Sequence, residues 1–346
     1  MSVAPKTVNL ALQGGGSHGA YTWGALDALI EDERVAIGAI SGASAGAMNA
    51  VVYADGFRAG GREGAKRKLH DFWLSVSSEG SLSPAQRRVF DVWLRAWAFA
   101  FPQASALWEA LSAYVSPYEF NPLNVNPLRD HLSAMVDFEA LRREHDVPLF
   151  IAATNVHTGR GEIFRREVLT ADHVMASVCL PHLFQAVVID GAPYWDGGFA
   201  GNPPLWPLFY ETGCRDTIIV QINPIERART PREPQEIADR INEITFNAGL
   251  LAELRAADFV ARLIDRGALV GNGYRRENLH RIGGDGKLES FGAASKTDVA
   301  WSFLTTLRDL GREAAKAWLA ENYDSIGVRS TLDLDRALNR VKVSDS

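Results

Sequence analysis

The first 55 residues of the chain run twice from a short apolar segment into a glycine-rich segment and then into helical spacing. Residues 7–12 are typical of a buried strand and lead into residues 14–19 (GGGSHG). Residues 35–40 are typical of a second buried strand and lead into residues 42–46 (GASAG). An order of strand, helix, strand and helix predicts a parallel sheet covered by helices.

The same alternation returns after residue 148. The later strand-like segments are residues 149–153, 161–164, 186–189, 194–195, 217–222 and 280–282. Helical spacing is found at residues 170–179, 234–264 and 302–323. Asp190-Gly191 is a dipeptide that favours a tight hairpin between two of these strands. We therefore expect an α/β fold with a central, mainly parallel sheet flanked by helices.

The segment between the two α/β parts has a different composition. We expect a single domain over residues 1–346, with a helical, lid-like insertion at 58–147 and a mainly helical C-terminal extension at 234–346. Residues 89–118 are rich in tryptophan, phenylalanine and tyrosine. Such a stretch is either core or an apolar lid that binds an acyl chain. The basic residues at 62–68 could meet lipid phosphates or form a solvated helix face.

Composition excludes some functions and compartments. The net charge of −6 argues against nucleic-acid binding, which usually requires a basic domain. The two cysteines, Cys179 and Cys214, suggest neither a disulfide framework nor a zinc site. We expect no cofactor. The first residues lack a secretory signal, and no segment approaches the roughly 20 apolar residues of a membrane span. We expect a cytoplasmic protein, with any membrane contact confined to the surface.

Two functions are possible for the first glycine segment, and its surroundings in the sequence distinguish them. Residues 14–19 match the Gly-x-Gly-x-x-Gly spacing of dinucleotide-binding loops. That function also needs an acidic residue at the end of the second strand, and the acids at 31–33 precede this strand instead. The remaining reading is an oxyanion hole, in which the backbone N–H groups of Gly14, Gly15 and Gly16 point into a cavity.

The second glycine segment has the Gly-x-Ser-x-Gly pattern of a nucleophile elbow, with Ser44 at its centre. This pattern requires a sharp turn from a strand to a helix, so that the serine hydroxyl is presented to a substrate. The preceding strand-like run and the following helical run fit that requirement. The alternative is a small-residue helix start that packs closely on the sheet.

The serine needs a base to take its proton. In a Ser–Asp–His triad the base would be His280, the only histidine late in the chain, although it lacks a glycine-flanked loop. The other candidate is Asp196, which precedes Gly197 and Gly198. A buried carboxylate beside the serine could act as the base directly, because burial raises its pKa. The alternative for Asp196 is an ordinary turn aspartate.

Taken in order, these segments resemble patatin-like phospholipases of a bacterial subgroup. The resemblance covers about residues 7–202 and rests on residues 14–19, 42–46, 176–184 (ASVCLPHLF) and 196–198 (DGG). It implies a Ser44–Asp196 dyad without histidine and an acyl-enzyme intermediate without a metal. It also implies that backbone amides of the glycine loop, those of Gly15 and Gly16 in particular, form the oxyanion hole.

One position departs from the family pattern. The family often has arginine or lysine where this chain has His18. A cation there would anchor the loop or attract phosphate, and the charge of a histidine would vary near pH 6.5. The departure weakens the expectation of a phospholipid substrate more than that of hydrolysis.

We therefore expect a serine lipid acyl hydrolase, that is, a phospholipase A, a lysophospholipase or an esterase. Its partner would be a lipid or another acyl ester, with peripheral membrane contact and no nucleic acid; the oligomeric state is open. The alternatives are an acyltransferase that uses the same acyl-enzyme, and a non-catalytic lipid-binding protein.

Overall fold

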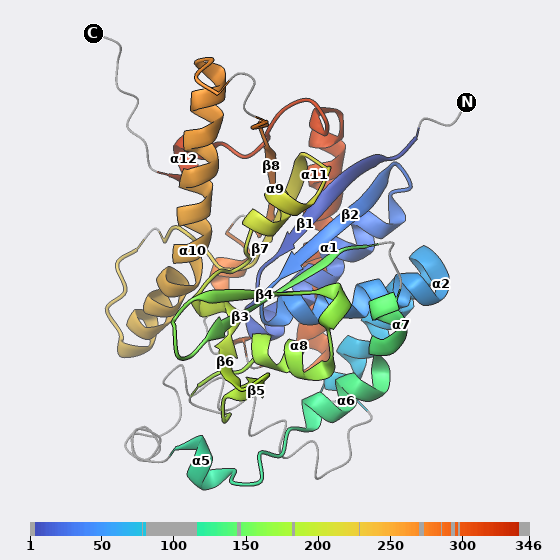
Figure 1. Cartoon of the computed structure of the whole chain (residues 1–346), viewed down its shortest axis with the longest axis vertical. Helices are drawn as coiled ribbons and strands as arrows, with labels where there is room; N and C mark the ends of the chain where they lie inside the picture. Colours follow the sequence, from blue (N-terminus) through green and yellow to red (C-terminus); the bar gives the residue numbers. More distant parts are fainter. Residues whose placement is uncertain are drawn as a thin grey trace.

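Figure 1 shows the computed structural model of the chain. The residues that it describes are 4–77, 79–80, 116–143, 147–181, 184–227, 229–269, 273–284, 286–291, 295–296 and 298–338. Most of the aromatic stretch 89–118 lies outside these ranges, so the choice between lid and core remains a prediction.

The centre of the molecule is an eight-stranded sheet with the order β5-β6-β3-β2-β1-β7-β8, in which β4 also pairs with β3 (Figure 1). Its strands are β1 (Lys6–Leu12), β2 (Val35–Gly42), β3 (Leu149–Asn155), β4 (Gly161–Arg165), β5 (Val187–Ile189), β6 (Ala192–Asp196), β7 (Asp216–Gln221) and β8 (Asn278–Gly283). Strands β3, β2, β1, β7 and β8 are parallel, whereas β4, β5 and β6 pair antiparallel. The expected mainly parallel α/β sheet is confirmed.

Helices cover both faces of the sheet. They are α1 (Gly19–Glu31), α2 (Ala45–Val76), α5 (Pro117–Phe120), α6 (Pro127–Met135), α7 (Phe138–Arg143), α8 (Ala171–Ser177), α9 (Trp206–Glu211), α10 (Pro234–Asp265), α11 (Trp301–Asn322) and α12 (Leu334–Ala337). Because side chains alternate along a strand, Leu10 and Ile218 join the core with α1, α2 and α11, whereas Ala11 and Ile219 join the core with α9 and α10.

The tight hairpin between β5 and β6 is present where the sequence predicts it. Asp190 and Gly191 have φ angles of 49° and 82°. Positive φ at both central residues matches the right-handed twist of the flanking strands. This hairpin fixes the register in which β6 ends at Asp196.

The expected insertion at 58–147 begins inside a helix. Position 58 lies within α2, which starts after Ser44 and is kinked where Gly60 and Gly61 leave helical geometry. Two of the basic residues in this part serve the fold: Arg62 donates to three backbone carbonyls between β2 and α1, and Lys68 pairs with Asp55. These contacts favour the structural interpretation of the basic residues.

The region expected as a C-terminal helical extension, residues 234–346, contributes to the central body. It contains β8, which pairs with β7, as well as α10, α11 and α12. Helix α11 packs on α1 so closely that a Cβ atom at Gly24 would lie 1.7 Å from the carbonyl oxygen of Arg308. Of the helices that the structure describes, none is long and apolar enough to cross a membrane.

Candidate active site

Ser44 occupies the turn between β2 and α2, as the elbow pattern predicts. Its φ of 53° and ψ of −126° lie where residues other than glycine are rarely found. The side chain does not cap α2, although it stands at the helix N-terminus. The hydroxyl is therefore left available for another partner.

The glycines of the elbow allow close backbone contact. A Cβ atom at Gly46 would lie 2.1 Å from the carbonyl oxygen of Leu12, at the end of β1. The elbow is also held from the other side, because the Ser44 N–H donates to Ser177 Oγ at 3.0 Å. Ser177 is the last residue of α8, in the segment 176–184 that carries part of the family resemblance. The structure thus gives this segment a role that the sequence did not specify.

The strand register brings Asp196 to Ser44. Gly42 pairs with Ile151 on β3, and two residues further along β3, Ala153 pairs with Asp196 on β6. Asp196 is therefore level with the position two residues beyond Gly42, where Ser44 lies. Its backbone is fixed on both sides, since its N–H donates to Cys179 O at 2.7 Å and its carbonyl accepts from Thr154 Oγ1 at 2.8 Å.

The carboxyl group of Asp196 is fully buried. Its Oδ1 accepts from the Gly198 N–H at 2.7 Å, whereas Oδ2 has no hydrogen bond of ordinary geometry in the part of the chain described. Burial raises the pKa of Asp196 to about 7, although the Gly198 N–H and the Ser44 hydroxyl both favour the ionised form. A carboxylate with such a pKa can exchange a proton near neutral pH.

The glycine loop lies directly against the nucleophile. A Cβ atom at Gly14 would be 2.4 Å from the Ser44 Cβ. The Gly14 N–H, however, donates to Asn202 Oδ1 at 2.6 Å, so it is not free to bind an oxyanion and the expectation for Gly14 needs correction. No hydrogen bond from the N–H of Gly15 or Gly16 is found among the described residues. The candidate donors are therefore the N–H groups of Gly15 and Gly16.

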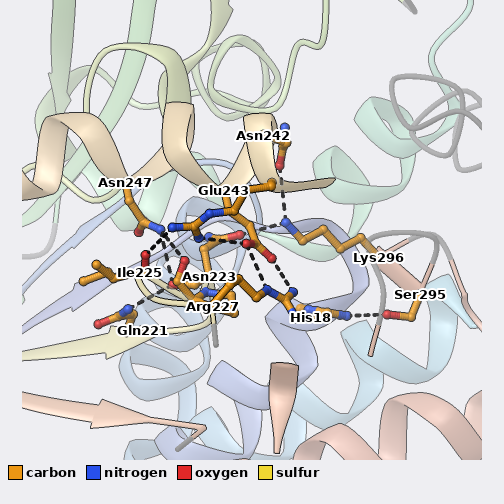
Figure 2. A network of polar contacts seen from close by, with 12 residues as sticks. His18, Gln221, Asn223, Ile225, Arg227, Asn242, Glu243, Asn247, Ser295 and Lys296 are labelled. Atoms are coloured by element: carbon orange, nitrogen blue, oxygen red, sulfur yellow. Dashed lines mark hydrogen bonds and ion pairs between the residues drawn. The ribbon is translucent and has the colours of Figure 1, made fainter. Parts of the chain in front are cut away.

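Polar side chains that the sequence reasoning missed hold this loop from behind. The Gln13 Oε1 accepts from the backbone N–H groups of Ile222 and Asn223, each at 2.9 Å. The Gly14 carbonyl accepts from Asn223 Nδ2 at 2.7 Å and from Asn202 Nδ2 at 3.2 Å. The sequence marks Gln13, Asn202 and Asn223 by position alone, since they flank glycine, proline or the end of a strand. Figure 2 shows Asn223 inside a larger polar network that also includes His18 and Lys296.

His18 does not behave as the sequence suggested. Its Nε2 lies 2.7 Å from Ser295 Oγ (Figure 2). Its ring packs near Phe291 and Phe303. Burial, together with the cations Lys296 and Arg227, lowers its pKa to about 3. The expected change of charge near pH 6.5 is therefore wrong, because the imidazole stays neutral across the physiological range.

His280 is not placed to serve Ser44. It is on β8, level with Ile218, Leu10 and Ile40 of the neighbouring strands. Three strand spacings, roughly 14 Å, separate it from β2. Its Nε2 lies 3.1 Å from Asp216 Oδ1 and its Nδ1 lies 2.9 Å from Thr331 Oγ1. The Ser–Asp–His alternative is therefore not supported by the structure.

A cavity of about 700 Å³ adjoins the polar side of the loop. Its walls include Asn223, Leu250, Arg281 and Trp318, but among the described residues that line it neither Ser44 nor Asp196 is found. The described residues also contain no cluster of histidine, cysteine, aspartate and glutamate that could hold a metal ion.

The chain is similar to known proteins in sequence and in structure. Two curated relatives, each named Lysophospholipase NTE1, come from strains JEC21 / ATCC MYA-565 and B-3501A of Cryptococcus neoformans var. neoformans serotype D. Each is 27% identical over 228 residues, which cover 66% of this chain but only 12% of the relative. The crystal structure of VipD from Legionella pneumophila superposes with a TM-score of 0.46 at 16% identity, covering 92% of this chain and 67% of VipD. A sequence model described as patatin-like phospholipase matches residues 10–209. The match covers more than half of the chain, so the chain belongs to the patatin-like phospholipase family.

Proposed function

We propose that the chain is a lipid acyl hydrolase of the carboxylic ester class, with Ser44 as nucleophile and Asp196 as general base. The observation that carries the proposal is the pairing of these two residues. Ser44 holds a backbone geometry that frees its hydroxyl, and Asp196 is a fully buried carboxylate whose Oδ2 has no other hydrogen bond of ordinary geometry among the described residues. The family membership supports lipid esters as the substrate class.

The reaction follows from the positions of these groups. Asp196 takes the proton of Ser44 Oγ as that oxygen attacks the ester carbonyl carbon. The negative charge moves to the carbonyl oxygen, where the N–H groups of Gly15 and Gly16 stabilise it. The C–O bond to the alcohol then breaks, the alcohol takes the proton from Asp196, and the acyl group stays on Ser44 as an ester. A water molecule gives a proton to Asp196 and attacks the carbonyl carbon of this ester. The bond from that carbon to Ser44 Oγ breaks, the fatty acid leaves, and Ser44 Oγ takes the proton back from Asp196.

The substrate proposed is a lysophospholipid or a related single-chain ester. The support is that both relatives are named as lysophospholipases, although this chain spans only a small part of their length. His18 adds no positive charge to the loop, because its pKa is lowered to about 3. Any recognition of a phosphate group therefore relies on other cations of the chain.

Helix α10 offers a surface for peripheral contact with a membrane. Ile237, Ile241 and Ile244 are 42%, 60% and 55% exposed and recur at spacings of four and three, so they share one helical face. Two residues after this stripe, Phe246 packs on Gly198 beside Asp196. An apolar stripe so near the dyad suits an enzyme that takes its substrate from a lipid surface.

Membrane contact is tested by sedimentation with phosphatidylcholine vesicles. We expect Ile241→Asp to bind vesicles several-fold more weakly while it still hydrolyses a water-soluble ester. Val328→Asp is the matched control, since Val328 is an exposed apolar residue far from α10 in sequence. Equal binding of both variants and the wild type would refute the membrane surface.

The nucleophile is tested with a fluorophosphonate probe. We expect labelling of the wild type and of Ser302→Ala, an exposed serine elsewhere on the chain, and no labelling of Ser44→Ala. Labelling of Ser44→Ala would refute the assignment.

Analysis of products from a lysophospholipid in the presence of glycerol then separates hydrolysis from acyl transfer, because a transferase forms a new glycerol ester in place of free fatty acid.

A further inference from the structure

A buried lysine lies behind the glycine loop that contains Gly14, Gly15 and Gly16. It is neither the proposed nucleophile nor the proposed base. Lys296 is only 3% exposed. Its Nζ donates to Asn223 Oδ1 at 2.8 Å and lies 3.4 Å from Asn242 Oδ1 (Figure 2). Burying an ammonium group is unfavourable unless its surroundings compensate for the lost hydration. The position of this cation therefore calls for a functional explanation.

The asparagine that receives this bond makes a second bond toward the active site. Asn223 donates through Nδ2 to the Gly14 carbonyl oxygen at 2.7 Å. The two atoms of Asn223 belong to one conjugated amide. A cation on its oxygen draws electron density from its nitrogen, which makes the Nδ2–H group a stronger donor.

The Gly14 carbonyl and the Gly15 N–H belong to the same peptide group. Because a peptide group is planar and trans, holding the carbonyl also fixes the direction of the N–H on its opposite side. Hydrogen bonds to the carbonyl oxygen polarise the group and strengthen the N–H as a donor. Asn202 adds a second, longer bond to the same oxygen at 3.2 Å.

We propose that Lys296 is a positioning residue for the oxyanion hole, acting through Asn223 on the Gly14–Gly15 peptide group. This proposal rests on the proposed function, because it concerns the charge that develops in ester hydrolysis. The charge at Nζ polarises the side-chain amide of Asn223, and this amide in turn polarises the Gly14–Gly15 peptide group, so that the Gly15 N–H becomes a stronger donor. The N–H then stabilises the oxyanion more strongly than an unassisted peptide group does.

The charged groups around Lys296 set the pH range of this effect. Burial and Arg227 lower the pKa of Lys296, to about 8, while Glu243 and Asp239 of α10 oppose that shift. His18 also interacts with Lys296 and stays neutral, since burial lowers its own pKa to about 3. Lys296 therefore loses its charge as the pH rises through about 8, and the oxyanion hole weakens over that range.

The test compares Lys296→Met, Lys296→Arg and the control Lys287→Met, which removes an exposed lysine. With p-nitrophenyl butyrate we expect Lys296→Met to lower kcat about tenfold with little change in KM, and to lose the decline above pH 8. Lys296→Arg should recover part of kcat, and Lys287→Met should match the wild type. If Lys296→Met keeps both kcat and the alkaline decline, the proposal is wrong.

A second measurement does not depend on activity. In the wild type with 15N-labelled glycine, the Gly15 amide signal should titrate near pH 8, and Lys296→Met should shift it upfield and abolish the titration. If Lys296→Met does not fold, Asn223→Asp removes the donor to Gly14 while keeping an acceptor for Lys296, and should cause the same upfield shift. An unchanged Gly15 signal overturns the proposal even in a protein without esterase activity. Inactivity of the wild type, in contrast, refutes the proposed function alone.

Discussion

Two buried aspartates of the same sheet have opposite surroundings. Asp216, at the start of β7, accepts three hydrogen bonds on Oδ1, from His280 Nε2 at 3.1 Å, Asn278 Nδ2 at 3.2 Å and the Gly327 N–H at 2.8 Å. Burial alone would raise its pKa, but these donors outweigh burial and hold the pKa below its usual value. Asp196, at the end of β6, has one donor on Oδ1 and none of ordinary geometry on Oδ2 among the described residues, and its pKa is raised to about 7.

The difference separates a structural carboxylate from the proposed base. The bonds that saturate Asp216 tie β7 to β8 and to the turn at Gly327, so its charge is used to hold the fold. Asp196 retains an oxygen that can accept a proton from Ser44. The carboxylate that has a histidine partner is thus the structural one, and the carboxylate without histidine is the candidate base.

The largest effect should come from Asp196→Asn. The amide keeps the shape of the side chain but cannot take a proton, so we expect kcat to fall roughly 10²- to 10⁴-fold. The measurement is steady-state hydrolysis of p-nitrophenyl butyrate. His280→Gln is the control and should retain kcat; loss of activity in that variant alone would reverse the assignment of the two aspartates.

Asp216→Ala should affect stability and leave catalysis unchanged. The change leaves buried donors on His280 and Asn278 without an acceptor, so the free energy of unfolding should fall by about 3 kcal/mol. Urea denaturation measures this loss, and active-site titration gives kcat per folded molecule. A fall in kcat per folded molecule would mean that Asp216 contributes to the chemistry.

The two carboxylates should also give stability opposite dependences on pH. The raised pKa of Asp196 means that the folded state holds its proton more tightly than the unfolded state, so its contribution decreases as the pH rises from about 4 to 7. Relative to wild type, Asp196→Asn should gain about 2 kcal/mol of stability between pH 5 and 7.5. The contribution of Asp216 is present above pH 4 and is lost as the pH falls through its lowered pKa. Urea denaturation of Asp196→Asn beside wild type at pH 5 and 7.5 tests the first sign. Urea denaturation of Asp216→Ala beside wild type at pH 7.5 and well below pH 4 tests the second. A stability difference from wild type that does not change with pH over its own range would contradict the corresponding sign.

Much of the fold follows from local patterns in the sequence. Residues 7–12 and 35–40 are apolar runs bounded by glycine, and the strands Lys6–Leu12 and Val35–Gly42 agree with them to within two residues. The pair Asp190-Gly191 specifies its hairpin because few other residues accept positive φ at both positions. The helical run expected after Ser44 is the start of α2, which is kinked where Gly60 and Gly61 leave helical geometry.

Less of the candidate site than of the fold could be predicted from the sequence. Ser44, Asp196 and the glycine loop have local signatures, and the structure brings them together. The occupied N–H of Gly14 could not be foreseen, because its acceptor Asn202 is 188 residues away. Lys296 lies 73 residues from Asn223, and no spacing rule predicts such a contact. The low pKa of His18 likewise depends on burial by distant segments.

The backbone of Ser44 has a consequence for the engineering of this chain. A positive φ is unfavourable for serine by about 1 kcal/mol or more, whereas glycine adopts it readily. Ser44→Gly should therefore unfold at a slightly higher temperature than the wild type while being inert toward esters. Selection for thermal tolerance alone would favour replacing Ser44, the proposed nucleophile, so a screen for stabilised variants of this protein must also select for turnover.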